Sequence, residues 1–362
     1  MGEPMHQWET CEAITPRFNE TLTANDTDHN LMRYSAFDTA LIVGIMPALL
    51  FLGLVTNLSF LIVVVCVPFM RTATNYYLSQ LAVADIALLI TAVGEKLWYF
   101  IASPFAMDTS VLGQAGCIWV PILKKTFSWV SMLLVTLLNF EKFYAVCWPL
   151  KHRTAQCQRK QGIRRRIFTI WLTGAAVSLL TVLNNGRYAT FRVIDGQDKL
   201  TGQDNLLEIG VCCPLTASLD IATLSIYGVL FVTFWLSNIF MSAGTIRAIK
   251  GRKVAACKEQ TINLPARRIQ SNNLIARMVI VNGMAYFLLL IPRHSYNIAQ
   301  VAKLNLLHES QRNIVLNITR IILYLNSVIN PVIYVLVNPR YRRAYKRVFW
   351  CQSKATRETA RT

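Results

Sequence analysis

Seven long apolar segments, separated by short polar stretches, limit what this chain can fold into more than any other feature. A helix needs roughly 20 apolar residues to cross about 30 Å of hydrocarbon. The candidate segments are 39–67, 75–101, 114–147, 167–186, 218–246, 274–300 and 313–337. Backbone amides inside a bilayer must all be hydrogen-bonded, and none of the segments alternates polar with apolar residues for long. The predicted fold class is therefore an all-α integral membrane protein with a seven-transmembrane helix bundle.

The composition agrees with a membrane protein and argues against a nucleic-acid-binding protein and against a zinc protein. Of the 362 residues, 54% are hydrophobic and 15% are charged, whereas soluble domains carry about 25% charged residues. The net charge of +18 comes from basic residues placed between the apolar segments, so nucleic acid is not a predicted partner. The nine cysteines lack zinc-type spacing apart from the adjacent Cys212 and Cys213, so no structural metal is predicted.

The charges of the connecting stretches predict the direction of insertion. Residues 1–38 hold seven acids against Arg17 and Arg33, whereas residues 151–166 hold seven basic residues and no acid. Cytoplasmic loops are rich in Lys and Arg, so we expect a multi-pass protein of the plasma membrane with its N-terminus extracellular and its C-terminus cytoplasmic. Orientation and contact with anionic lipid are enough to explain the basic loops, and a G-protein footprint there is an added hypothesis.

Three regions follow from this topology. We expect an extracellular glycosylated tail at 1–38, the seven-helix domain at 39–337, and a cytoplasmic amphipathic helix and tail at 338–362. Asn19 and Asn25 begin glycosylation sequons in the polar tail. Asn57 and Asn317 also begin such triplets, but these lie inside predicted membrane segments and are discounted.

Polar side chains inside the apolar segments predict a buried polar centre. An ionisable group in mid-membrane costs roughly 2.5–3.5 kcal/mol, so Asp85 in the second segment is expected to face the bundle and to have a function. The other polar residues expected around it are Asn57, Ser131, Asn326, Ser327 and Asn330. They either bind a sodium ion or water through oxygen ligands or form a structural hydrogen-bond cluster that joins the helices. A sodium ion near Asp85 is therefore the one candidate cofactor.

Several motifs, in order, resemble the rhodopsin-like (class A) G-protein-coupled receptors. Asn-Tyr-Tyr-Leu at 75–78 and Leu-Ala-Val-Ala-Asp at 81–85 look like the second helix of that family, and Asn-Pro-Val-Ile-Tyr at 330–334 is similar to its seventh-helix motif. Residues 338–351 resemble the short amphipathic helix along the inner membrane face. The resemblance covers about residues 38–351.

The amphipathic helix carries two further expectations. Cys351 matches a typical palmitoylation position of the family. The side chains expected to face lipid at helical spacing are those of Tyr341, Tyr345, Val348 and Phe349.

The resemblance implies a receptor that binds an extracellular ligand and activates heterotrimeric G proteins, with arrestin as a further partner. Asn-Tyr-Tyr-Leu and Ala-Val-Cys-Trp-Pro-Leu at 145–150 look most like the peptide-binding branch. A peptide or neuropeptide is therefore the expected ligand.

The family also implies a disulfide between the outer end of the third helix and the second extracellular loop. Cys117 and Glu141 are 24 residues apart, about 36 Å of helix, which sets them at opposite ends of the third segment. The resemblance implies that Cys117 bonds either Cys212 or Cys213. The remaining cysteine pairs with Cys11 or stays free, and the sequence leaves both alternatives open.

The activation motifs depart from the family pattern. Glu141 is followed by Lys142 where the family has arginine, and lysine lacks the planar, multi-donor fork. We expect Lys142 to pair with Glu141 in a weaker lock. In the sixth segment Pro292 should still bend the helix, but Leu290 stands in place of the family's tryptophan. Pro292 and the stretch from Asn330 through Pro331 to Tyr334 are the expected moving elements.

Charged residues near the outer ends of the segments predict the ligand chemistry. Lys124 lies two helical turns before Ser131 on one face, where small-amine receptors carry aspartate, so charge repulsion argues against an amine ligand. By analogy, its neighbours are Glu95, Lys96, Arg293, His294 and Arg320. Such a cavity suits an anionic ligand or an acidic peptide. Alternatively, Glu95 only neutralises Lys124 or Arg320, and His294 is a hydrogen-bonded helix residue.

Other functional classes have less support. Segment 313–337 contains no lysine, which excludes the Schiff base of the usual retinal photoreceptors. A transporter or a non-signalling seven-helix protein is the alternative, although no half-chain repeat is found. No nucleophile elbow, phosphate loop or paired metal-binding motif supports an enzyme.

Overall fold

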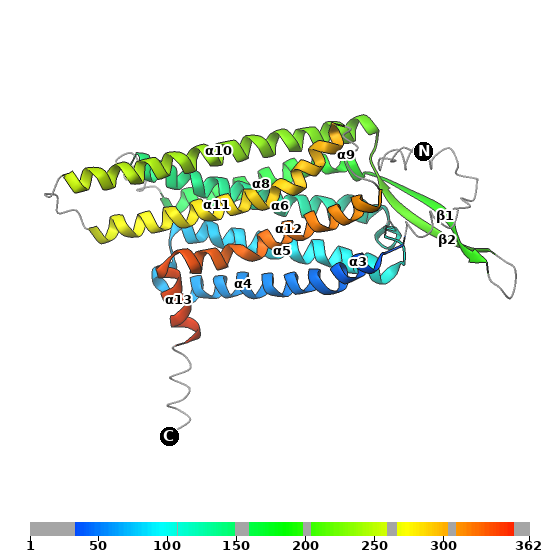
Figure 1. The fold of residues 1–362 in the computed structure, drawn as a ribbon, viewed down its shortest axis with the longest axis horizontal. Helices are drawn as coiled ribbons and strands as arrows, with labels where there is room; N and C mark the ends of the chain where they lie inside the picture. Colours follow the sequence, from blue (N-terminus) through cyan, green and yellow to red (C-terminus); the bar gives the residue numbers. More distant parts are fainter. Residues whose placement is uncertain are drawn as a thin grey trace, which may run out of the picture.

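The computed structural model describes residues 33–106, 108–148, 159–197, 204–258, 266–302 and 309–350. Within these residues, seven helical segments are long and apolar enough to cross a membrane. They lie side by side along the length of the molecule (Figure 1). The predicted number of spans and the fold class are confirmed.

The helices extend past the apolar segments at several ends. The first span joins α3 (Ala36–Thr39), the π-helix η1 (Ala40–Ile45) and α4 (Met46–Cys66), and the fourth joins α8 (Arg159–Ser178), η5 (Leu179–Thr181) and α9 (Val182–Asn185). The other spanning helices are α5 (Ala73–Ala102), α6 (Gly113–Cys147), α10 (Ala217–Lys258), α11 (Ala266–Val301) and α12 (Glu309–Val337). The short helices are η2 (Pro68–Met70), η3 (Ser110–Leu112) and α13 (Pro339–Phe349). Polar residues continue α10 and α11 because a helix leaving the hydrocarbon still satisfies its own backbone.

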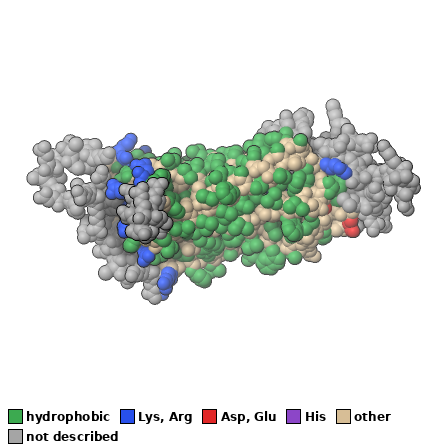
Figure 2. Space-filling model, turned by 90° about the horizontal axis from the view of Figure 1, so that it is seen from below, with side chains coloured by type: hydrophobic (Ala, Val, Ile, Leu, Met, Phe, Trp, Pro, Cys, Tyr) green, Lys and Arg blue, Asp and Glu red, His purple; other side chains and the backbone are tan. Residues whose placement is uncertain are grey.

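The outer surface of the bundle is apolar, and polar side chains are buried inside it among apolar ones. Phe51 and Phe240 are 66% and 70% exposed, whereas Asn57 and Asp85 are buried. On the face that Figure 2 shows, apolar side chains cover the middle of the molecule, and most of the visible Lys and Arg side chains lie at one end. The exposed basic residues there include Arg71, Arg342, Arg343, Lys346 and Arg347. This distribution is expected where lipid, not water, surrounds the helices.

The two ends of the bundle carry different structures. A hairpin of β1 (Arg187–Gln197) and β2 (Asp204–Cys213) lies at one end, and α13 lies across the other (Figure 1). The strands are antiparallel, with Arg187 opposite Cys213 and Tyr188 opposite Cys212. We name these the hairpin end and the α13 end.

Candidate functional site

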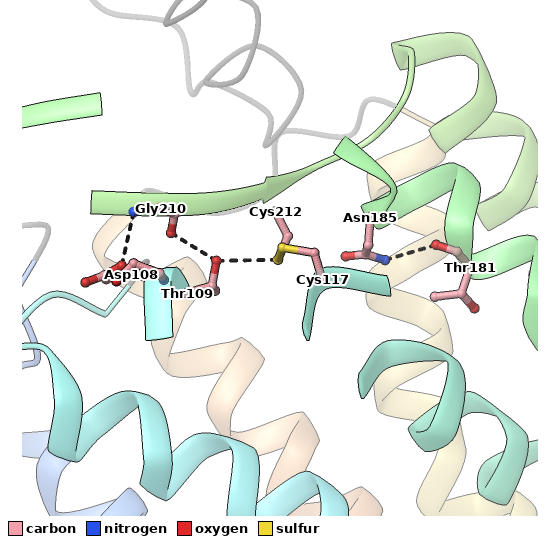
Figure 3. Close-up of a disulfide and its surroundings, with 8 residues drawn as sticks. Asp108, Thr109, Cys117, Thr181, Asn185, Gly210 and Cys212 are labelled. Atoms are coloured by element: carbon pink, nitrogen blue, oxygen red, sulfur yellow. Dashed lines mark hydrogen bonds between the residues drawn. A yellow bond between two sulfur atoms is a disulfide. The ribbon is translucent and has the colours of Figure 1, made fainter. Parts of the chain in front are cut away.

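A disulfide fixes the hairpin to the bundle. Cys117, near the start of α6, is bonded to Cys212 in β2, with 5.4 Å between their Cα atoms (Figure 3). The structure therefore selects Cys212 of the two candidates. Cys213 is disulfide-bonded as well, so the alternative in which it stays free is wrong. Its expected partner, Cys11, lies outside the described residues.

A second attachment lies beside the disulfide and was not anticipated from the sequence. The Asp108 carboxylate accepts hydrogen bonds from the backbone amides of Ser110 at 2.8 Å and Gly210 at 3.1 Å. The Thr109 backbone amide and hydroxyl both donate to the Gly210 carbonyl, at 2.7 and 2.9 Å (Figure 3). An aspartate that bonds its own chain two residues on is a recognisable turn signal, but it does not reveal the partner in β2. These bonds hold the hairpin close to the mouth of the bundle.

Beneath the hairpin end, Lys124 on α6 donates to the carboxylate of Glu95 on α5. The Glu95 side chain is 7% exposed and that of Lys124 is 27% exposed. Two turns along α6, Ser131 also faces α5, as the helical spacing predicted. The structure thus contains the internal ion pair that the sequence offered as an alternative to direct ligand contact by Glu95.

The two predicted arginines have unlike surroundings. Arg320 on α12 donates to the side-chain oxygen of Asn317 at 2.8 Å, and the Asn317 amide in turn donates to Asp38. Arg293 on α11 has a buried Nη1 without a hydrogen-bond partner among the described residues. Its guanidinium carbon lies 6.0 Å from the ring centroid of Tyr296. Arg293 is therefore the less satisfied of the two.

His294 packs as an aromatic side chain. Its ring stacks on that of Phe231 in α10, with centroids 3.8 Å apart and planes 6° from parallel. The structure places His294 at the contact between α10 and α11.

Two further lysines belong to the same cluster. Lys96 lies over the ring of Tyr99, 5.5 Å from its centroid, and Lys125 lies 4.8 Å from the centroid of Tyr227. Lys96 was a predicted neighbour, whereas Lys125 was missed. The signal for Lys125 was present, because a second lysine in an apolar segment is costly without a function.

The charges of this cluster act on one another. Lys96 is subject to the charges of Arg320, Glu95, Lys124 and Arg293. Lys125 is subject to the charges of Arg293 and Lys124. In the described part of the chain, Glu95 is the carboxylate that forms an ion pair with the cluster. The hairpin end therefore holds an excess of positive charge between α5, α6, α11 and α12.

The buried polar centre lies deeper in the bundle. Asp85 accepts hydrogen bonds from Ser131 at 3.1 Å and from Asn330 at 2.7 Å. Asn57 on α4 donates to the Ser327 carbonyl at 2.9 Å. These bonds join α4, α5, α6 and α12, as the structural alternative requires.

The oxygen atoms of the same centre also suit a small hard cation. Carboxylate, hydroxyl and amide oxygens are the ligands that such cations prefer. Asn326 and Asn330 each present a buried amide oxygen without a partner among the described residues. The residues present therefore fit a sodium ion.

At the α13 end, the predicted pair of Glu141 with Lys142 is wrong. Glu141 accepts from Arg166 on α8 at 2.9 Å, and Lys142 donates to Thr74 on α5 at 2.5 Å. Neighbouring residues on a helix point to different faces, so each side chain finds its partner on another helix.

The predicted moving elements lie in the core. Pro292 is inside α11 and Pro331 is inside α12. Leu290 and Tyr334 are buried. The Tyr334 ring packs against Phe60 at 5.3 Å between centroids.

The orientation predicted for α13 is wrong in part. Tyr341 is buried and its hydroxyl donates to Asn75 on α5, while Tyr345 lies within 3.4 Å of the Ser59 hydroxyl. Burial raises the pKa of the Tyr341 phenol above its ordinary value, so it keeps the proton that it donates. Of the predicted lipid-facing residues, Phe349 is exposed and Val348 half-buried. A tyrosine with an amide within reach gains more from that bond than from lipid.

The proposed modification sites Asn19, Asn25 and Cys351 lie outside the described residues.

Comparison with known proteins gives a consistent result. Residues 56–334 match the family described as 7 transmembrane receptor (rhodopsin family). The thyrotropin-releasing hormone receptor of Mus musculus is 27% identical over 321 residues, covering 85% of this chain and 79% of the relative. Growth hormone secretagogue receptor type 1 of Homo sapiens is 25% identical over 362 residues, covering 94% and 92%. Neuromedin-U receptor 2 of Rattus norvegicus is 24% identical over 336 residues, covering 88% and 78%.

Proposed function

The chain belongs to the rhodopsin family of seven-transmembrane receptors, and on that premise we propose that it binds an extracellular peptide and activates heterotrimeric G proteins. The relatives are named as receptors for thyrotropin-releasing hormone, neuromedin U and a growth hormone secretagogue. These names, together with the peptide-branch motifs at 75–78 and 145–150, support a peptide ligand. Arrestin is proposed as a further partner at the same end as the G protein.

The proposed orientation has the hairpin end outside and the α13 end in the cytoplasm. The Cys117–Cys212 disulfide lies at the hairpin end, and disulfides persist in oxidising compartments. The exposed basic residues gather at the α13 end, as cytoplasmic surfaces of membrane proteins do.

The observation that carries the ligand proposal is the excess of cations beneath the hairpin. Lys124 on α6 pairs with Glu95, and the charge of Arg320 on α12 also acts on that carboxylate. An acidic group of the ligand would supply the missing negative charge and bridge α6 to α12. Such charge-assisted hydrogen bonds are the strong ones at a binding site.

Activation follows from the ligand's preference between two states. The energy for the change can come only from tighter binding to the active state. We propose that α11 swings outward at the α13 end about Pro292, and that the segment from Asn330 to Tyr334 rearranges with it. When the G protein binds, the contacts of Glu141 with Arg166 and of Lys142 with Thr74 at that end would then break, and these side chains would take other partners.

The resting state is proposed to bind a sodium ion at the polar centre. Asp85, Ser131, Asn326 and Asn330 would hold it, and the ion would supply positive charge between α5, α6 and α12. The structural hydrogen-bond cluster remains the alternative.

A peptide-library screen on cells that express the chain, read by calcium and cyclic nucleotide, would identify an agonist. Purified receptor with that agonist should then accelerate nucleotide exchange on a G protein. Flux of labelled solute into proteoliposomes, without such exchange, would instead indicate a transporter. A peptide that binds without exchange would indicate a non-signalling seven-helix protein.

A further inference from the structure

The cations at the hairpin end fall into two groups with different partners. Lys124 faces α5 and pairs with Glu95. Lys125, the next residue, is turned by about 100° around α6 and lies against Tyr227 of α10. The two lysines therefore contact different helices, α5 and α10.

In the described part of the chain, neither Lys125 nor Arg293 forms an ion pair with a carboxylate. The charges that act on Lys125 come from Arg293 and Lys124, and both are positive. The charges that act on Lys96, on the other side, include that of Glu95. On the α5 side, by contrast, Glu95 supplies a carboxylate that pairs with Lys124.

Arg293 points to the same conclusion through its hydrogen bonds. A guanidinium has five donors, yet the buried Nη1 of Arg293 has no acceptor among the described residues. Its neighbour is the ring of Tyr296, which attracts a cation but offers no strong acceptor for its N–H groups. A buried donor left without an acceptor is costly, and an incoming anion removes that cost.

The surroundings of these two cations strengthen their attraction for an anion. Tyr227, Phe231 and the stacked ring of His294 form an aromatic wall from α10 and α11. Tyr227 and Phe231 are about one turn apart on α10, so Lys125 over the first ring and His294 on the second bring α6 and the Arg293–His294 segment of α11 to the same part of α10. Electrostatic attraction is stronger beside such apolar groups than in water.

We propose that Lys125 and Arg293 form a second anion-binding subsite, for a second acidic group of the ligand. This inference rests on the proposed function. The first acidic group binds on the Lys124 and Arg320 side, and the second binds between α6 and α11. The ligand class is thus narrowed to peptides with two separated acidic groups, either two acidic side chains or one side chain and a terminal carboxylate.

A binding experiment without G protein tests the subsite directly. The midpoint of thermal unfolding is measured for the purified full-length receptor in the presence of the dicarboxylates glutarate and adipate. The comparison compound is the monocarboxylate butyrate at the same ionic strength. We expect the dicarboxylates to raise the midpoint more than butyrate does, and Lys125→Gln to abolish that difference. Lys125→Gln should also raise the midpoint without any anion, because it removes a half-buried charge that has no ion-pair partner among the described residues. Equal stabilisation by all three acids, or an unchanged response of Lys125→Gln, would overturn the subsite.

Two controls separate binding from folding. Lys125→Arg keeps the charge and should keep the dicarboxylate response, even if Lys125→Gln does not fold. Arg187→Gln removes a cation of the hairpin and should respond like the wild type. Loss of the response in Arg187→Gln would show a general charge effect and overturn the proposal.

A signalling experiment separates failure of the subsite from failure of the proposed function. Three peptide libraries are screened for agonists, read by nucleotide exchange on the G protein. They contain two, one or no acidic positions and are otherwise matched, because Gln replaces Glu where an acid is removed. We expect active peptides from the di-acidic library, with at least about tenfold lower potency on Lys125→Gln, the equivalent of about 1.4 kcal/mol. Active peptides of equal potency from the neutral library would overturn the subsite and leave the receptor function standing. Inactivity of all libraries together with normal dicarboxylate binding would count against the function alone.

Discussion

The hairpin-end half of the bundle and the half toward α13 contain different kinds of buried polar groups. Near the hairpin, Lys96, Lys125 and Arg293 lie over aromatic rings, and one carboxylate, Glu95, serves the cluster in the described structure. Toward α13, amides bond one another and nearby hydroxyls, with Asn139 to Asn238 at 2.5 Å and Asn238 to Thr136 at 2.9 Å, and the buried carboxylate of Glu141 is paired with Arg166.

The difference indicates separate tasks for the two halves. Neutral groups that satisfy each other hold helices together without needing a partner from outside. Unbalanced charge is costly in a membrane and is kept where something binds it. We therefore expect ligand recognition near the hairpin and helix rearrangement, with little change in net charge, toward α13.

The largest stability effect is expected for Glu95→Gln. It leaves the half-buried Lys124 without its ion-pair partner, and we expect a loss of about 3 kcal/mol, the lower end of what breaking a buried pair costs. The unfolding midpoint of the purified receptor should fall clearly. The double variant Glu95→Gln with Lys124→Gln should recover most of the loss. A single variant as stable as the wild type would contradict the difference between the halves.

A smaller effect is expected for Asn238→Leu in the half toward α13. It removes hydrogen-bond partners of Asn139 and Thr136, and an unsatisfied buried polar group costs about 1–3 kcal/mol. The same midpoint measurement checks it. The double variant with Asn139→Leu should cost less than the sum of the two single changes, because both polar groups are then gone. Additive losses would show that the two amides do not act as a pair.

Tyr341→Phe should cost about 1 kcal/mol, the net value of one hydrogen bond. The change removes the hydroxyl that donates to Asn75 and leaves the ring packed. Tyr345→Phe is the matched control, since its contact with Ser59 is long at 3.4 Å, and it should cost less. If the two variants have equal unfolding midpoints, the Tyr341 hydroxyl does not attach α13 to the bundle as assigned.

The smallest stability effect is expected for Arg166→Gln. The Arg166 side chain is 57% exposed, so solvent screens its ion pair, and the new glutamine can still donate to the buried Glu141 carboxylate, which limits the loss to about 0.5 kcal/mol. Its consequence should appear in signalling, as raised nucleotide exchange without agonist. Arg164→Gln, an exposed cation of the same helix, should leave basal exchange unchanged.

Asp85→Asn tests the polar centre through its ion response. If sodium binds there, agonist affinity should depend on sodium in the wild type and lose that dependence in the variant, because the ion loses its anionic ligand. Lithium and potassium serve as comparison cations at equal ionic strength. A variant that keeps the full sodium response would place the ion elsewhere and leave Asp85 with a structural role.

The sequence was sufficient for the fold because apolar length is a local property. Each spanning segment satisfies its own backbone, so its existence does not depend on its neighbours. The buried position of Asp85 followed from the same reasoning. The helix ends were less predictable, because the polar turns of α10 and α11 carry no signal that marks the membrane boundary.

The site was only partly predictable because its contacts join distant segments. Nothing in the sequence distinguishes Cys212 from its neighbour, and only the strand register places it beside Cys117. The partners of Glu141 and Tyr341 come from α8 and α5, so spacing along one helix could not identify them. Lys125 was overlooked because Lys124 already accounted for a charge at that level of α6.

The most direct test of the ligand-binding role of the hairpin-end half is the response of nucleotide exchange to removal of acidic groups from an active peptide. An agonist found by screening is compared with its analogues in which each acidic group is changed to the amide, on the wild type and on Lys124→Gln. We predict at least about a tenfold loss of potency for an essential acidic group, about 1.4 kcal/mol, and a smaller loss on the variant that already lacks its partner. Full potency of the neutral analogue on the wild-type receptor would contradict the account.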